Sequence, residues 1–193
     1  MDFRFLYNRT KYFLISPVKA WEVVHRENRP INYVRGSFFL PLVILVSLSS
    51  FFGSMFFINT TLKPMYSVLT CIDTFLFLYF GAYMSAFIVK EITRALDLGH
   101  DFVVAYKLVA YSLTPILLTL TVSRLLESLL FLNLLGLYGL YIFWKGMEVM
   151  VNPPEHKKRP MMIATVVAML IIFGLLQVVL SFLAETVYFA LFT

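Results

Sequence analysis

The chain has 193 residues, of which 60% are hydrophobic, 17% are aromatic and only 14% are charged, and its formal net charge is +5. A soluble domain carries roughly 45–50% apolar residues, so this composition excludes a soluble domain and indicates a membrane protein. We attribute the positive charge to membrane orientation and to attraction to anionic lipid headgroups, and we expect no nucleic-acid partner.

Five apolar stretches predict an all-α, polytopic membrane protein with five transmembrane helices in a bundle. Each stretch is about 20 residues long, the length at which a helix crosses the hydrocarbon core. The stretches are 37–58, 66–89, 103–123, 128–148 and 161–184. We expect residues 1–36 to form a cytoplasmic segment without a cleavable signal peptide, and residues 37–193 to form one membrane domain.

The basic residues predict the orientation of these spans. If the N-terminal segment and every second loop are cytoplasmic, all sixteen lysines and arginines except Lys63 and Arg124 lie on that side. Short loops rich in lysine and arginine stay in the cytoplasm. We therefore expect a cytoplasmic N-terminus and an exterior C-terminus.

A short amphipathic helix is predicted ahead of the first span, at Pro17–Asn28. Ser16 followed by proline is typical of a helix start. Val18, Trp21 and Val24 then share one face, with charged residues opposite. We expect this helix to lie at the cytoplasmic membrane interface, where tryptophan is favoured. Docking onto a partner protein would give the same pattern.

Prolines, glycines and polar clusters predict the connections. Asn59–Pro64 should be an exterior turn, and the loop Lys90–Asp101 should hold a helix stop and a new N-cap. Spans three and four should be joined tightly around Arg124–Glu127. Asn152–Pro160 contains three prolines and should form the last cytoplasmic loop. Pro41 is expected in the opening turn of span one, where proline is tolerated.

Within the membrane, local signals predict one kink and close helix packing. Pro115 should kink span three, and the hydroxyl of Ser112 or Thr114 should satisfy the carbonyl that it frees. Small residues four apart allow helices to approach closely, and we favour packing inside this bundle over packing between copies. These pairs are Gly81 and Ser85, Ala82 and Ala86, and Ala164 and Ala168.

Ionisable and amide side chains at membrane depth are candidate functional groups because burying them is costly. An Asp73–Arg124 ion pair near the outer boundary is geometrically possible. It would staple spans two and three together; ion or proton movement, or a solvated Asp73 near the interface, are the alternatives. The candidate intramembrane polar cluster comprises Asp73, Arg124, Glu127, Asn133, Gln177 and Glu185.

No pattern indicates catalysis, a metal or a cofactor. His25, His100 and His156 fall in separate segments, without the Cys and His spacing of a zinc site. We find no nucleophile elbow, phosphate loop or paired-histidine helix. Cys71 lies inside the second span and is the single cysteine, so no intramolecular disulfide can form.

Two stretches carry a family resemblance: Ala105–Pro115, an aromatic-rich entry to span three that leads to proline, and Leu137–Met150 ahead of a proline-containing loop. With the five-span plan and the Pro17–Trp21 segment, the chain resembles the Yip domain family (Ypt/Rab-interacting membrane proteins), particularly its prokaryotic members.

That resemblance implies a non-enzymatic membrane protein and supplies no catalytic residues. Eukaryotic members are five-span proteins of the early secretory pathway that bind prenylated Rab GTPases and each other. They carry a cytoplasmic N-terminal region longer than residues 1–36 of this chain. The prokaryotic resemblance implies the cytoplasmic (inner) membrane.

Our functional hypothesis is a membrane adaptor or scaffold without cofactors. It would bind protein partners or anionic lipid through a cytoplasmic basic face, and a membrane protein or a further copy of the chain is the kind of protein partner that we consider. That face comprises Lys19, Arg26, Arg29, Arg35, Lys157, Lys158 and Arg159. The alternative is a small transporter or channel that uses polar residues behind the Pro115 kink. An intramembrane lipid-modifying enzyme is a weaker third hypothesis.

Overall fold

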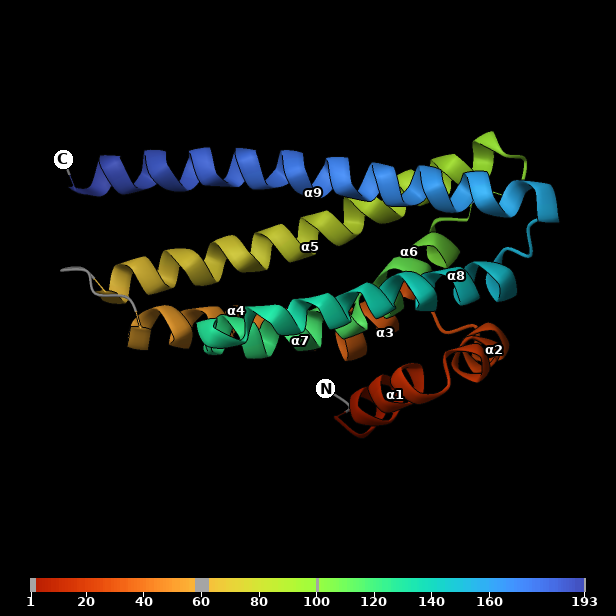
Figure 1. The fold of residues 1–193 in the computed structure, drawn as a ribbon, viewed down its shortest axis with the longest axis horizontal. Coiled ribbons are helices and arrows are strands. Elements are labelled where there is room, and N and C mark those ends of the chain that lie inside the picture. Colours follow the sequence, from red (N-terminus) through yellow and green to blue (C-terminus); the bar gives the residue numbers. More distant parts are fainter. Residues whose placement is uncertain (1–2, 58–62, 100, 193) are drawn as a thin grey trace.

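The computed structural model describes residues 3–57, 63–99 and 101–192, and every described element is helical (Figure 1). In chain order the elements are α1 (Phe3–Ile15), α2 (Pro17–Glu27), α3 (Ile31–Val34), η1 (Arg35–Phe39), α4 (Leu40–Phe57), α5 (Lys63–Ala95), α6 (Phe102–Ser112), α7 (Thr114–Leu125), η2 (Glu127–Leu137), α8 (Tyr138–Met150) and α9 (Glu155–Phe192). The predicted all-α class is confirmed. His100 lies outside the described residues, and so does most of the predicted turn at 59–64.

The predicted set of membrane spans is also confirmed. Four helices are long and apolar enough to cross a membrane: Ile31–Phe57, Pro64–Ala95, Ser128–Met150 and Glu155–Ala184. The bent pair of α6 and α7 makes a fifth when it is counted as one span. Which side of the membrane each terminus occupies stays a prediction.

The long helices run side by side along the bundle. α5 packs between α4 and α9, α4 also packs against α7, and α1 and α2 lie against one end (Figure 1). Ala82, Ser85 and Ala86 of α5 are fully buried, so these small residues pack inside the bundle as predicted. α9 instead buries Met161 and Thr165, while Ala164 stays exposed.

The first span is continuous from Ile31 but contains one widened turn. Arg35–Phe39 form a π-helix, and the N–H of Leu40 bonds to the Arg35 carbonyl five residues back. Pro41 follows directly; proline has no N–H, and its ring clashes with the carbonyl four residues earlier in an α-helix. A wider turn relieves that clash. Pro41 is therefore inside the span and not in its opening turn.

The third span is kinked as predicted. α6 and α7 meet at an angle of 41°. Pro115 cannot donate to the Tyr111 carbonyl, and the hydroxyl of Thr114 donates to that oxygen at 2.6 Å instead. Of the two hydroxyls that the sequence offered, Thr114 satisfies the freed carbonyl, while the buried hydroxyl of Ser112 has no partner among the described residues.

The fourth span is not α-helical throughout, which corrects the prediction for 128–148. Its first part, η2, is a 3₁₀-helix that starts directly after α7, as the predicted tight link requires. Side chains three residues apart share one face of a 3₁₀-helix. Asn133 and Gly136 both use that face against α7: Asn133 accepts a hydrogen bond from Ser123 at 2.9 Å, and Gly136 lies against Ile116.

The last helix begins earlier than predicted. α9 starts at Glu155, so the stretch Glu155–Pro160 is helical and the prediction of a loop there is wrong. The N–H groups of Lys157 and Lys158 bond to the Pro154 carbonyl and form the first turn. Pro160 removes only one backbone hydrogen bond. Because it lies near the N-terminal end of α9, this loss disturbs the helix little.

Candidate functional site

The first two helices fold back onto the bundle and create the site. α2 begins at Pro17 as predicted and ends at Asn28, whose backbone is left-handed (φ 38°), a conformation that asparagine tolerates. Trp21 is fully buried, and its indole Nε1 donates to the Ile142 carbonyl of α8 at 2.8 Å. A Cβ on Gly146 would lie 2.4 Å from the Trp21 ring, so the missing side chain makes room for it.

This packing shows what the apolar face of α2 covers, while its place at the membrane interface stays a prediction. Trp21 and Val24 face the protein's own helices α6 and α8, whereas Val18 is 38% exposed. The apolar pattern therefore marks a surface that docks within the chain. An amphipathic pattern alone does not distinguish a lipid surface from a protein surface, because both are apolar.

α1 was not predicted, and an aromatic cluster holds it in place. The ring of Phe13 stacks on Tyr111 of α6 at 4.6 Å and meets Trp21 edge-on at 4.9 Å. Phe38 of η1 also contacts Tyr111 at 4.6 Å. Such pairs contribute about 0.5–1.5 kcal/mol each beyond the area that they bury.

Three charged side chains join α1 to α2. Arg9 is 6% exposed, and its Nη2 lies 2.6 Å from Oε2 of Glu27. Nε of Arg29 lies 2.7 Å from the same oxygen. Burial opposes the charge of Arg29, but the hydrogen bond to Glu27 and the charge of that carboxylate outweigh it and raise the pKa of Arg29. The Arg29 guanidinium also covers the Phe5 and Tyr33 rings, at 4.7 and 4.5 Å.

A further cation lies behind this network. Lys107 of α6 is 1% exposed, and its Nζ donates to Oδ1 of Asn28 at 3.2 Å. Among the described residues it forms no ion pair with a carboxylate. The C-terminal end of α2 lies beside it, and the partial negative charge of those carbonyls favours a cation.

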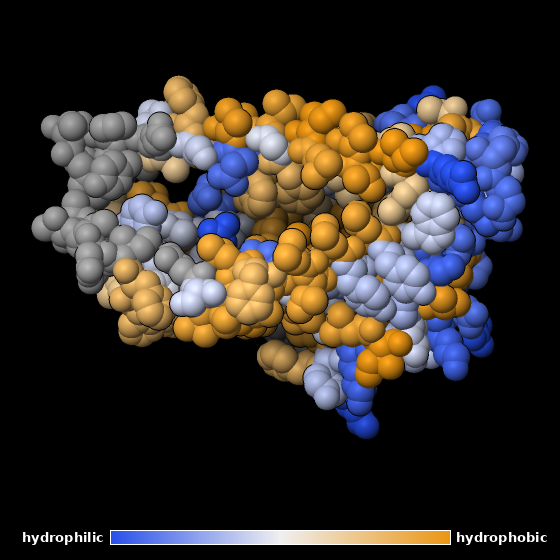
Figure 2. Space-filling model, viewed as in Figure 1, coloured by the Kyte–Doolittle hydropathy of each residue, from blue (hydrophilic) through white to orange (hydrophobic). Residues whose placement is uncertain are grey.

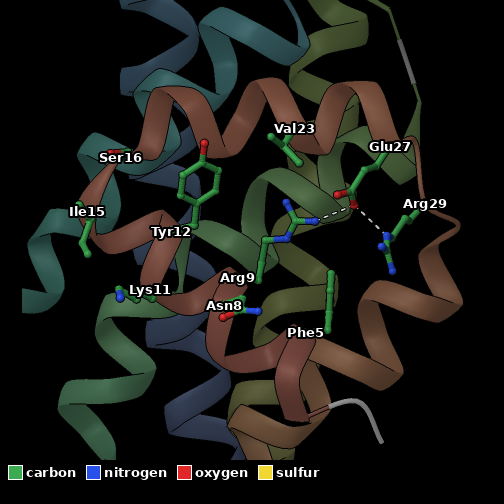
Figure 3. A pocket seen from close by; sticks show the side chains of 10 residues that line it. All are labelled: Phe5, Asn8, Arg9, Lys11, Tyr12, Ile15, Ser16, Val23, Glu27 and Arg29. Atoms are coloured by element: carbon green, nitrogen blue, oxygen red, sulfur yellow. Dashed lines mark hydrogen bonds and ion pairs between the residues drawn. The ribbon is translucent and has the colours of Figure 1, made fainter.

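Between α1 and α2 lies an open cleft of about 470 Å³ (Figure 3). Arg9 and Tyr12 reach across it from α1 towards α2, and Glu27 and Arg29 stand at the far end of α2. The lining residues are Phe5, Asn8, Arg9, Lys11, Tyr12, Ile15, Ser16, Val23, Glu27 and Arg29. The lining therefore combines three cations, one carboxylate and several apolar or aromatic walls.

The predicted basic face divides into structural and exposed cations. Arg35 donates to Tyr83 at 3.2 Å and to Asn32 at 3.1 Å. Lys157 donates to the Leu96 carbonyl at 2.6 Å, and Lys158 pairs with Glu155 at 2.6 Å. Lys19, Arg26 and Arg159 are exposed.

Most of these cations gather at one end of the molecule. Figure 2 shows an apolar band over the middle and hydrophilic residues at the right-hand end. α2, the end of α5, the end of α8 and the start of α9 lie at that end in Figure 1. We call it the basic end.

Among the described side chains, no direct bond joins two members of the predicted intramembrane cluster. No ion pair within 4 Å joins Asp73 to Arg124 in the described part of the chain, although their charges attract each other at longer range. Asn133 bonds to Ser123, and Gln177 bonds to Ser181 one turn along its own helix. The side chains of Glu127 and Glu185 lie outside the described residues.

Sequence reasoning missed Arg9, Glu27 and Lys107. The signal available for α1 was the spacing of Leu6, Arg9 and Phe13 on one helical face. An arginine on a helical face is usually solvated and is almost never fully buried unless it is paired. Only the fold places it beside Glu27.

Comparison with known families identifies the architecture. The pattern of the Yip1 domain matches residues 11–177, from within α1 into α9. The chain belongs to the Yip1 domain family. Yip1 proteins are non-enzymatic, multi-pass membrane proteins of membrane trafficking, which confirms the predicted family and the absence of an enzymatic role. Comparison with curated proteins and with solved structures gives no match.

Within the Yip1 domain, the matched residues include α2 and the parts of α6 and α8 against which it packs. The segment that forms α2 therefore lies within the matched domain. Prokaryotic membership and the inner-membrane location stay predictions.

Proposed function

We propose that this Yip1 domain is a membrane adaptor whose basic end, on the cytoplasmic side, binds protein partners at the membrane surface. The observation that carries the proposal is the docked pair of α1 and α2. Trp21 and Phe13 fix these helices to the bundle, while α2 leaves Lys19 and Arg26 exposed. A fixed, positively charged surface favours the binding of a partner, because little conformational entropy is lost when the complex forms.

The exposed cations are available to a partner. Lys19 and Arg159 have no hydrogen bond or ion pair with another described residue. Arg26 has one contact, with Glu22 at 3.7 Å, and its side chain is 75% exposed. Such an exposed pair contributes about 0–1 kcal/mol, so it does not withhold the arginine from a partner. Anionic lipid headgroups would be attracted to the same surface.

The test is quantitative cross-linking in native membranes, followed by identification of what is captured. The test variant reverses charge at Lys19→Glu, Arg26→Glu and Arg159→Glu; the control keeps charge at the same positions with Lys19→Arg, Arg26→Lys and Arg159→Lys. We expect the reversed variant to lose a protein partner at least about tenfold, as close charge pairs across an interface allow. Capture that is equal in both variants, with insertion intact, would refute the adaptor proposal.

Point substitutions are needed because removal of the N-terminal helices would not be a clean test. Phe13 and Trp21 are both fully buried against the bundle. A deletion of residues 1–29 would expose the surface that they cover, and a lost partner would then report unfolding.

A further inference from the structure

The cleft between α1 and α2 has an unbalanced charge. Arg9, Lys11 and Arg29 line it, with Glu27 as the one carboxylate of the lining. Both arginines bond to the same oxygen of Glu27, Oε2. Lys107 lies behind, in a smaller recess that Glu27 and Arg29 also line. Buried and partly buried cations are stable when an anion pairs with them, so the cleft lacks negative charge.

The cleft also holds donors that the protein does not use. Lys11 is exposed and bonds to no other described residue. Arg29 uses its Nε for Glu27, and its two terminal nitrogens form no ion pair with a carboxylate in the described part of the chain. Planar guanidinium groups with free N–H pairs match the oxygens of a phosphate group.

The walls of the cleft are apolar and its rim continues into an exposed apolar stripe. Tyr12 and Val23 line the interior. Along the outer side of α1, Phe3 and Tyr7 are 68% and 67% exposed, and Ile15 is 68% exposed. Aromatic and aliphatic side chains in this arrangement favour the boundary between lipid headgroups and acyl chains.

Contacts of α1 and Arg29 with two spans support a position of the cleft at that boundary. The hydroxyl of Tyr138 donates to the Leu14 carbonyl at 3.3 Å. Tyr138 lies inside the span Ser128–Met150, so α1 lies beside the span and not beyond its end. Arg29, on the other side of the cleft, comes directly before the span Ile31–Phe57. A ligand in the cleft is thus in reach of both the headgroup layer and the acyl chains.

We propose that this cleft binds the phosphate-bearing headgroup of an anionic phospholipid. The terminal nitrogens of Arg29 contact the phosphate oxygens, and Lys11 adds positive charge at the opposite end of the cleft. Arg9 supports the site from below through Glu27, and the acyl chains leave along Phe3 and Tyr7. The inference deepens the proposed function and rests on its placement of the basic end at the membrane surface. A lipid in this cleft would join α1 to α2 and tie the positively charged surface to the bilayer.

The test uses the full chain in nanodiscs of phosphatidylcholine with a minor fraction of phosphatidylglycerol, and native mass spectrometry of the lipid retained after extraction. The cleft variant is Lys11→Gln with Arg29→Gln. The matched control is Lys19→Gln with Arg26→Gln, which removes the same charge from the outer surface of α2. We expect the cleft variant to lose retained phosphatidylglycerol about tenfold and the control less than about twofold, because charge-assisted hydrogen bonds are lost only in the first.

Two further experiments distinguish a lipid headgroup from a soluble anion as the ligand of the cleft. Inorganic phosphate and glycerol phosphate are added as competitors, and we expect neither to displace the lipid, because neither contacts the apolar walls. Displacement by either would assign the cleft to a soluble anion and overturn the lipid proposal. A photoreactive side chain at Ile15 should capture phospholipid; capture of a protein segment there would also overturn it.

Equal loss from both glutamine variants would mean general charge attraction, and no loss from either would mean that the cleft does not hold the lipid. Both outcomes refute the site. The adaptor proposal depends on a different readout, a protein captured through Lys19, Arg26 and Arg159, so the two proposals can fail separately.

Discussion

The docking of α2 is tested most directly by Trp21→Ala. A tryptophan side chain buries about 150–250 Å², which at about 25 cal/mol/Å² corresponds to roughly 4–6 kcal/mol. The lost hydrogen bond to Ile142 adds about 1 kcal/mol. Partial collapse of the site reduces the cost, and truncation of buried aromatic residues typically costs about 3–5 kcal/mol. We therefore expect the free energy of unfolding to fall by about 4 kcal/mol.

The assay is thermal or denaturant unfolding of the full chain in a mild detergent, with proteolysis of the N-terminal helices as a second readout. Val18→Ala is the matched control, because Val18 is on the same predicted apolar face but is 38% exposed. We expect it to change stability by less than about 0.5 kcal/mol. If the two substitutions had equal, small effects, α2 would be an interfacial helix and the docked arrangement would be refuted.

Three other substitutions test neighbouring contacts by the same unfolding measurement. Gly146→Ala should destabilise by about 1–3 kcal/mol, because the new Cβ would lie 2.4 Å from the Trp21 ring, whereas Gly174→Ala, with open space around it, should be tolerated. Thr114→Val should cost about 1–3 kcal/mol, since it leaves a backbone carbonyl without a donor at the kink, and a serine at that position should restore most of it. Glu27→Gln should cost roughly 1–3 kcal/mol by removing the partner of buried Arg9.

For each of these three substitutions, one result would contradict the expected effect. A neutral Gly146→Ala would mean that the Trp21 ring is not packed on α8. Equal stability of the valine and serine variants would mean that the side-chain bond at the kink is not made. An unchanged Glu27→Gln would mean that the 2.6 Å pair with Arg9 does not hold α1 to α2.

Local signals were sufficient for much of the fold. The lengths of the apolar stretches located every span. Crossing the hydrocarbon core requires about 20 apolar residues, regardless of which helices pack against the span. Pro115 predicted its own kink, because a missing N–H acts on the residue itself and on the carbonyl four residues back. Asp101 was expected as a new N-cap, and it accepts the N–H of Val103 at 2.7 Å.

Relations between segments were not accessible in the same way. Trp21 and Val24 were assigned to one apolar face of α2 and are buried there. However, Trp21 meets Ile142, 121 residues away, and no local pattern encodes that contact. Similarly, the rotation of each helix about its own axis decides whether Asp73 reaches Arg124, and the hydropathy of the sequence does not predict that rotation. The 3₁₀ geometry of η2 depends on Ser123 and Ile116 of the preceding helix, so composition alone favours an ordinary α-helix there.

The contact between Trp21 and Ile142 also bears on how the protein is made. At about 5–20 residues per second, the ribosome needs roughly 6–24 s to synthesise the 121 residues that separate the two partners. During that interval α2 has no α8 to pack against, and Phe13 must likewise wait for Tyr111. A nascent chain stopped after the third span would therefore carry exposed N-terminal helices open to chaperones and proteases. The first helices to leave the ribosome are among the last to reach their final positions.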